Sequence, residues 1–138
     1  MPSHEASNAV RYLFLLGRIL YGGFFLLNAY HHFTGVSAMA PYAGSRGVPA
    51  PRAAILGSGV LLALGGLSIL LGVKPKLGIL CVVLFLLPVS FTMHNYWADR
   101  DPQARQMNQI QFNKNMGLLG AALMLLAIPE PWWLSLGD

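Results

Sequence analysis

The chain has 138 residues, of which 55% are apolar and only 10% carry a charge, against about 25% charged in an ordinary soluble domain. A soluble domain this small has too much surface to cover with so few charged side chains, so the composition excludes that class. The net charge of +4 reflects only five acidic residues and no basic cluster, which excludes a nucleic-acid partner, and the single cysteine, Cys81, excludes disulfide scaffolds and cysteine-based metal centres.

Four segments are apolar enough to face lipid. Each approaches the 17–25 residues or so that a helix needs to cross the hydrocarbon core of a bilayer, although the last is short and has Lys114 near its start. The sequence therefore predicts an all-α, four-helix transmembrane bundle, with residues 1–138 as one domain. The expected helices are 12–33, 52–73, 76–97 and 111–128.

The segments between these helices carry turn signals. Residues 35–51 are rich in Gly, Pro and Ala and are expected to form a long connection, and residues 99–108 are expected to form a polar one. Pro88 should kink the third helix without ending it. Arg18 and Asn28 interrupt the first apolar run, which argues against a cleaved signal peptide, so we expect that helix to be retained.

Polar residues inside the apolar spans are the candidates for function, because a polar side chain in lipid is costly and is rare unless it has a role. With an even number of spans, the end of the first helix, the end of the third and the start of the fourth lie on the same side of the membrane. We therefore expect the polar residues at those ends to converge on one ligand-binding site. They are Asn28, His32, His94, Asn95, Trp97, Lys114 and Asn115.

Each of these residues also has a purely structural interpretation. A histidine where a helix leaves the bilayer often lies among lipid headgroups, which applies to His31 and His32. Lys114 could extend to the interface, and Asn28 and Asn115 could join helices through hydrogen bonds. Arg18 lies about 21 Å along the helix from His32, so it belongs near the opposite face as an intramembrane charge, where Glu130 is the available acidic partner.

The predicted cluster suits an amphipathic ligand better than a metal. No spacing of His or Cys defines a metal site, and no flavin or nucleotide motif is present. The carbonyl oxygens of a quinone head would accept hydrogen bonds from histidine, lysine or asparagine, and Trp97 could stack on its ring. The sequence requires no cofactor, and quinone is the ligand that we consider first.

The order of several short motifs resembles the DoxX family of small four-helix membrane proteins. The resemblance extends from about residue 11 to residue 126. The motifs are, in chain order, Gly17-Arg18-Ile19-Leu20 with Gly22, Val48-Pro49-Ala50-Pro51, Gly65-Gly66 with Leu70-Leu71-Gly72, His94-Asn95-Tyr96-Trp97 with Asp99, and Gln111-Phe112-Asn113-Lys114-Asn115 with Leu118-Leu119-Gly120.

The resemblance implies a location in the cytoplasmic membrane of a prokaryote and a link to oxidoreductases, since some members are subunits of a thiosulfate:quinone oxidoreductase. The matching polar residues are Arg18, His94, Trp97, Lys114 and Asn115. One departure is the absence of the glutamate that members commonly carry shortly before the paired glycines Gly65 and Gly66. A mechanism that relies on that carboxylate does not transfer to this chain.

Two functional classes remain open from the sequence. The first is a redox-associated subunit that binds quinone or another small amphipathic molecule; if it takes part in catalysis, it does so as an accessory subunit of a quinone-linked oxidoreductase. The second is a non-enzymatic membrane scaffold or partner-binding subunit. Besides the lipid bilayer, the expected partners are a second copy of the chain or oxidoreductase subunits.

Overall fold

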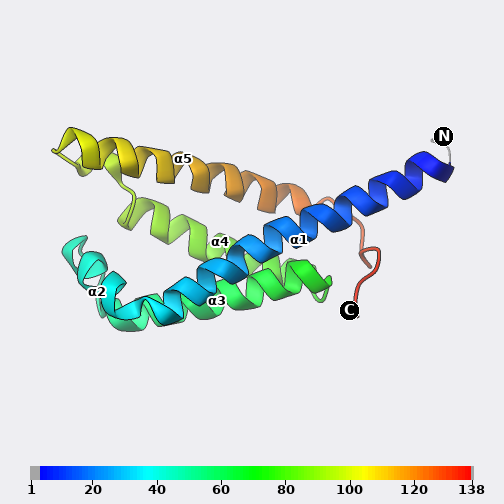
Figure 1. Ribbon diagram of the computed structural model, residues 1–138, viewed down its shortest axis with the longest axis horizontal. Coiled ribbons are helices and arrows are strands. Elements are labelled where there is room, and N and C mark those ends of the chain that lie inside the picture. The colour runs from blue at the N-terminus through cyan, green and yellow to red at the C-terminus, as the bar shows by residue number, and fades with distance from the viewer. Residues whose placement is uncertain (1–3, 138) are drawn as a thin grey trace.

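The computed structural model describes residues 4–137, with side chains described from residue 7 onward, and all of its regular secondary structure is helical (Figure 1). The elements, in chain order, are α1 (His4–Thr34), α2 (Val36–Ser45), α3 (Pro51–Leu71), α4 (Pro75–Thr92), the 3-10 turn η1 (Tyr96–Ala98) and α5 (Pro102–Leu125). Three of these helices are long and apolar enough to cross a membrane, namely α1, α3 and α4, the last counted together with η1.

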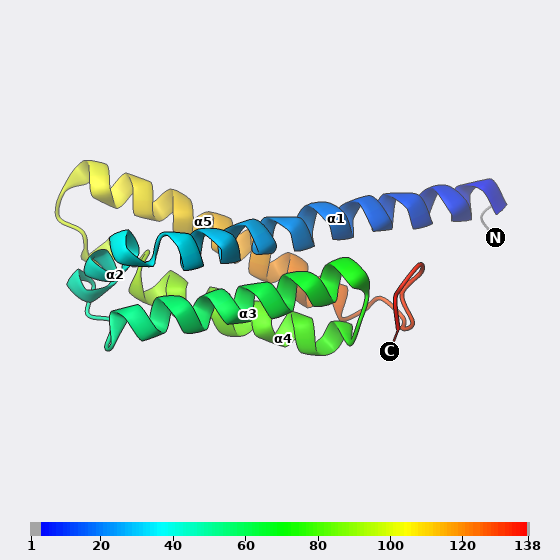
Figure 2. The same ribbon diagram turned by 60° about the horizontal axis from the view of Figure 1, so that its bottom comes forward.

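The long helices pack in series, α1 against α3, α3 against α4, and α4 against α5. The N-terminal part of α1 extends beyond the rest of the bundle, and both described termini lie at the same end of the molecule (Figures 1 and 2). The short helix α2 packs on α3 and α1 at the other end. The arrangement is that of a helical membrane bundle, with large apolar side chains exposed along its outer faces.

The core of the bundle depends on close approach of α1 and α3. A Cβ added to Gly22 would lie 2.8 Å from the carbonyl oxygen of Gly66, and a Cβ added to Gly66 would lie 2.8 Å from the carbonyl oxygen of Gly22. Only glycine permits this distance between two helices, a common contact in membrane bundles. Phe25, Leu62, Val82 and other side chains from α1, α3 and α4 fill the centre.

Two expectations about the connections are wrong. The segment expected as a long first connection contains α2, whose Val36 and Ala43 are buried against Ile55 of α3. The polar connection after residue 99 is short, because α5 begins at Pro102 and not at residue 111. Asp101 caps α5 by accepting a hydrogen bond from the backbone N–H of Ala104 at 3.0 Å, and Pro102 occupies the first turn, where proline is favoured.

The ends of the helices also differ from the predicted ranges. The first helix begins at His4, eight residues before the apolar run, and α5 ends at Leu125, before the predicted residue 128. Helix α4 passes through Pro88, as predicted, but it ends at Thr92 and not at residue 97. The amide-rich first half of α5 keeps this helix out of the set that is apolar enough to span a membrane.

Candidate functional site

A cavity of about 570 Å³ lies at the end of the bundle that carries α2 and the connection between α4 and α5. All five α-helices contribute to its wall, and most of the lining is apolar, including Phe24, Ile55 and Phe85. Of the described residues, Lys114 is the one charged side chain that lines it, and no carboxylate does. The volume is in the range of small-molecule sites, about 300–1,000 Å³.

Two polar side chains reach the cavity from α1. Asn28 and His32 are one helical turn apart, so they lie on the same face. The side-chain N–H of Asn28 donates to the carbonyl oxygen of Phe24 at 2.8 Å, and Nδ1 of His32 lies 2.8 Å from the carbonyl oxygen of Asn28. His32 is buried beside the ring of Phe85, whereas His31 is exposed.

Helix α5 adds Lys114 and Asn115 from the opposite wall. The Lys114 Nζ donates to Oε1 of Gln111 at 2.6 Å and lies 5.7 Å from the centre of the Phe24 ring. Asn115 is 5% exposed, and its side chain forms no hydrogen bond with any residue that the structure describes. A buried amide without a partner in a cavity is a group that a ligand or water would satisfy.

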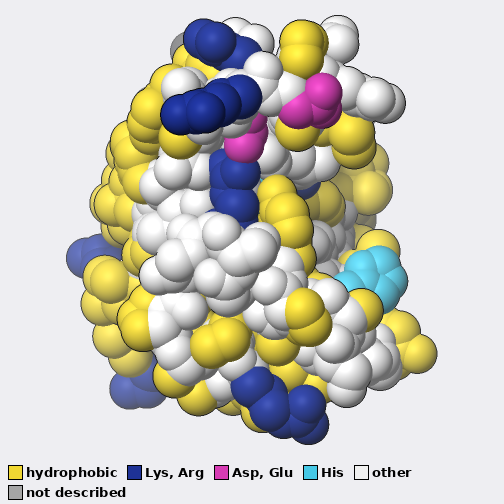
Figure 3. All heavy atoms as spheres, turned by 90° about the vertical axis from the view of Figure 1, so that its left-hand side faces the viewer, with side chains coloured by type: hydrophobic (Ala, Val, Ile, Leu, Met, Phe, Trp, Pro, Cys, Tyr) yellow, Lys and Arg dark blue, Asp and Glu magenta, His cyan; other side chains and the backbone are white. Residues whose placement is uncertain are grey.

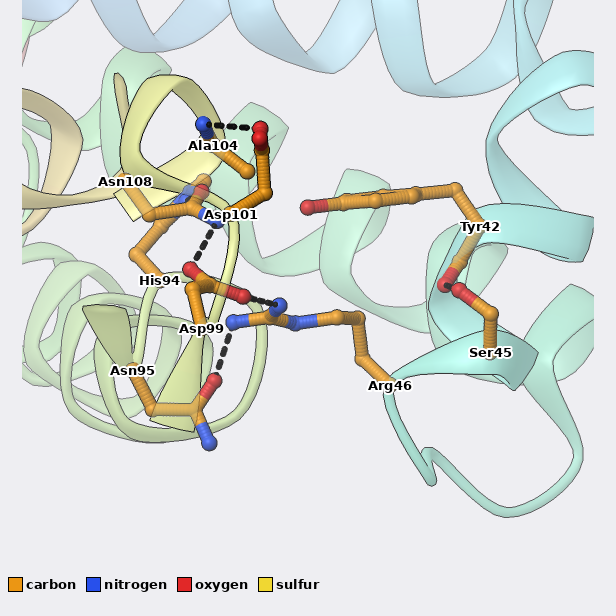
Figure 4. Close-up of polar contacts among 9 residues, drawn as sticks. All are labelled: Tyr42, Ser45, Arg46, His94, Asn95, Asp99, Asp101, Ala104 and Asn108. Atoms are coloured by element: carbon orange, nitrogen blue, oxygen red, sulfur yellow. Dashed lines mark hydrogen bonds and ion pairs between the residues drawn. The ribbon is translucent and has the colours of Figure 1, made fainter. Parts of the chain in front are cut away.

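His94 lies just after the end of α4 and is held by a set of polar residues that we call the polar clasp. The clasp consists of Arg46, His94, Asn95, Asp99 and Asn108 (Figure 4). Nδ1 of His94 lies 3.2 Å from Oδ1 of Asn108, and Nδ2 of Asn108 donates to Asp99 at 2.8 Å. Arg46 donates to Asp99 at 2.5 Å and also to Oδ1 of Asn95.

The clasp connects α2 to the far side of the cavity. Arg46 is the C-cap residue directly after α2, and Asp99 lies between η1 and α5. The hydrogen bond from Asn108, together with that from Arg46, lowers the pKa of the Asp99 carboxyl below its ordinary value. Lys and Arg side chains gather with acidic ones on this end of the molecule (Figure 3).

The structure thus brings five of the seven predicted ligand-binding residues to one cavity, namely Asn28, His32, His94, Lys114 and Asn115. The other two, Asn95 and Trp97, do not line it. Asn95 is held by Arg46, and Trp97 is half exposed in a cluster of rings with Phe91, Tyr96 and Phe112. The end of α4 at Thr92 explains this, because the face shared by His94 and Trp97 requires a helix that continues to residue 97.

Arg18 lies near the opposite end of the bundle and is 2% exposed. Its guanidinium donates to the carbonyl oxygens of Ile69 and Leu70 at the end of α3, and to those of Trp133 and Leu134 in the C-terminal segment. The expected ion pair with Glu130 does not form among the described residues. The carbonyl groups at the end of a helix carry partial negative charge, and they replace the carboxylate as its partner.

Sequence reasoning missed Arg46 as a member of the site. Arg46 and Asp99 are 53 positions apart and on different elements, so no local spacing relates them. Asn108 shares a helix face with Gln111 and Asn115, a periodicity visible in the sequence, but its contact with His94 depends on the unpredicted start of α5. No group of three His, Cys, Asp or Glu side chains within the described part of the chain is placed to hold a metal ion.

Comparison with known proteins identifies the family. The DoxX family model matches residues 13–95, which is more than half of the chain and extends from α1 past the end of α4. Neither a curated protein nor a solved structure matches the chain. With three apolar helices long enough to cross a bilayer, the protein is an integral, multi-pass membrane protein, and it belongs to the DoxX family.

Proposed function

We propose that this DoxX-family protein binds quinone or another small amphipathic molecule in the cavity between α1, α4 and α5. The observation that carries the proposal is the convergence of Asn28, His32, His94, Lys114 and Asn115 on one largely apolar cavity. Polar side chains at this depth are costly in lipid and are retained where they bind or transport something. An apolar wall with a few polar groups suits a ring with an aliphatic tail.

The residues present fit a quinone-type head. The unpartnered amide of Asn115 and the ammonium group of Lys114 supply donors for ring oxygens, and Phe24 and Phe85 supply apolar contacts. The described residues include one cysteine and no metal-binding group, so the chain contributes binding and hydrogen bonds to the ligand. We place such a protein in the cytoplasmic membrane of a prokaryote, as an accessory subunit of a quinone-linked oxidoreductase.

The test is direct binding to the purified protein in lipid nanodiscs. A decyl-substituted quinone and its hydroquinone serve as probes, with quenching of Trp fluorescence as the signal. We expect saturable binding by the natural chain and a loss of at least about fivefold in affinity for Asn115→Leu, because removal of a buried amide that bonds to the ligand costs about 1–3 kcal/mol.

Matched controls separate the cavity from the bulk bilayer. Asn113→Leu changes an exposed amide two positions away on the same helix, outside the cavity, and should bind as the natural chain does. Equal affinity for the natural chain, Asn115→Leu and Asn113→Leu, or signals that rise linearly with probe concentration, would show partitioning into lipid and would refute the proposal.

One observation favours the scaffold alternative as a second candidate. Gly17, Gly23, Gly57, Gly117 and Gly120 have nothing within 4 Å of an added Cβ, so packing inside the bundle does not require them to be glycine. Open glycine faces are typical of contacts between membrane helices. If the protein is a scaffold, Gly117→Leu or Gly120→Leu, both outside the cavity, abolishes its assembly with itself or with a partner subunit, and the cavity variants leave assembly intact.

A further inference from the structure

Several donors of the cavity wall are already engaged by the protein itself. Asn28 donates through Nδ2 to the carbonyl oxygen of Phe24 at 2.8 Å, Ser58 to that of Ile55 at 2.9 Å, and Thr92 to that of Pro88 at 2.7 Å. A hydroxyl has a single donor, so Ser58 and Thr92 present their oxygen atoms as acceptors to a ligand, whereas Asn28 keeps one N–H beside its acceptor oxygen.

The N–H donor of His32 is also engaged by the protein itself. The atom 2.8 Å from its Nδ1 is the carbonyl oxygen of Asn28, which can only accept, so Nδ1 carries the hydrogen of this contact. In a neutral imidazole one nitrogen is protonated and the other has a lone pair. The Nε2 atom of neutral His32 is therefore an acceptor.

The polar clasp puts His94 in the same tautomer. The Asp99 carboxylate only accepts, so the atom of Asn108 that faces it at 2.8 Å is the amide nitrogen. The remaining amide atom, Oδ1, is the one near Nδ1 of His94, at 3.2 Å. This ring nitrogen therefore donates to Asn108, and Nε2 is left with its lone pair. Arg46 fixes the carboxylate from the other side (Figure 4).

The two cavity histidines accordingly present acceptors, and a ligand that pairs with either of them must bring a donor. Donors remain beside these acceptors. They are Lys114, which has N–H bonds beyond the one to Gln111, the unpartnered amide of Asn115, the amide nitrogen of Gln111 and the hydroxyl of Tyr42. We propose that the cavity takes a molecule with a hydroxyl-bearing head, of the phenol or hydroquinone class, on an apolar tail. The hydroxyl donates to Nε2 of a cavity histidine and accepts from Lys114 or Asn115.

This inference rests on the proposed function and narrows it. A fully oxidised quinone head has carbonyl oxygens only, so it cannot donate a hydrogen bond to Nε2 of His32 or His94. A quinone bound beside these nitrogen atoms would shield them from water and leave their lone pairs without a donor. A hydroxyl group satisfies both kinds of atom. Asp99 and Asn108 are then positioning residues, because they act on the ligand through the orientation and tautomer of His94.

The test compares two probes that differ in one hydrogen-bond donor and are inert to redox chemistry and to thiols. These are 4-decylphenol and its methyl ether, titrated into the full chain in nanodiscs at pH 8, where imidazoles are neutral. We expect the phenol to bind on the order of tenfold more tightly. Asn108→Leu should lower this ratio at least about threefold.

Asp101→Asn is the matched control, because it removes a carboxylate two positions from Asp99 and retains an N-cap side chain for α5. It should keep the full ratio between phenol and ether. The ¹⁵N spectrum of histidine-labelled protein, with His94→Ala to assign the signals, gives a readout that packing alone would not change. We expect neutral His94 to be protonated at Nδ1 in the natural chain and to change tautomer in Asn108→Leu.

The outcomes separate the two proposals. Equal binding of phenol and ether at the cavity, or a His94 protonated at Nε2, overturns the inference and leaves the cavity as a binding site. Absence of saturable binding by any probe, quinone included, refutes the proposed function and with it the ligand class. If Asn108→Leu does not fold, the tautomer in the natural chain and the ratio in Asp99→Asn decide.

Discussion

The contact between Gly22 of α1 and Gly66 of α3 yields the sharpest prediction about stability. A Cβ at position 22 would lie 2.8 Å from the carbonyl oxygen of Gly66 and 3.0 Å from the backbone nitrogen of Leu70. Ordinary contacts between carbon and oxygen begin near 3.3 Å, so in Gly22→Ala the two helices must separate by about 0.5 Å along this line. Overpacking of this kind costs about 1–3 kcal/mol.

Gly23→Ala is the matched control, because nothing lies within 4 Å of a Cβ at that position. Both substitutions gain the same helix propensity, about 1 kcal/mol. The difference in free energy of unfolding between the two variants therefore isolates the contact, and Gly22→Ala should be about 1–3 kcal/mol less stable than Gly23→Ala.

The assay is unfolding in mixed micelles with increasing SDS, followed by far-UV circular dichroism. The transition for Gly22→Ala should lie at lower SDS than that of Gly23→Ala. Coincident transitions for the two variants would refute the close packing of α1 on α3. A shift of the same size in Gly23→Ala would place the contact on the wrong face of α1.

Two further predictions concern the polar groups at the two ends of the bundle. Arg18→Lys keeps the charge, but lysine has one nitrogen where the guanidinium bonds to four carbonyl oxygens. We expect the free energy of unfolding in the same SDS titration to fall by about 2–4 kcal/mol, and proteolysis after residue 128 to become faster. An unchanged stability would show that the C-terminal segment does not depend on Arg18. The folded-state pKa of Asp99 lies below its unfolded value, so the stability that its carboxylate contributes is complete above about pH 4 and is lost as pH falls through the lowered folded-state pKa. The thermal unfolding midpoints of the natural chain and of Asp99→Asn should therefore differ near pH 7 and converge at acid pH. A constant difference between the two midpoints at all pH values would contradict the role of the clasp.

The spanning helices could be predicted from sequence because a lipid-facing helix must be apolar along its length. Hydropathy alone located α3 and α4 to within a few residues at their starts. It could not locate α2 or the first turns of α5, which are helical for other reasons, namely the cap of Asp101 and the burial of Val36 and Ala43 at the end of the bundle. The pair Asp101-Pro102 is a helix-start signal that is visible in the sequence, but the charged residues around it favoured a loop in the prediction.

The candidate site was partly predictable for a similar reason. Asn28 and His32 share a face by helical periodicity, and antiparallel helices bring their ends to the same side of the membrane. The positions of Asn95 and Trp97 depended on where α4 ends, which its apolar run does not determine. The contact between Arg46 and Asp99 joins distant segments and required the fold itself.

The claim at the centre of this account is that an amphipathic molecule occupies the cavity between α1, α4 and α5. The most direct measurement is photo-crosslinking in native lipid with a diazirine-tagged alkyl hydroquinone, followed by mapping of the adducts by mass spectrometry. The account predicts adducts on segments 24–32, 84–94 and 111–115 that excess untagged hydroquinone suppresses. Adducts spread over the outward apolar side chains, such as Leu13, Leu80 and Met124, and insensitive to that competitor, would contradict it.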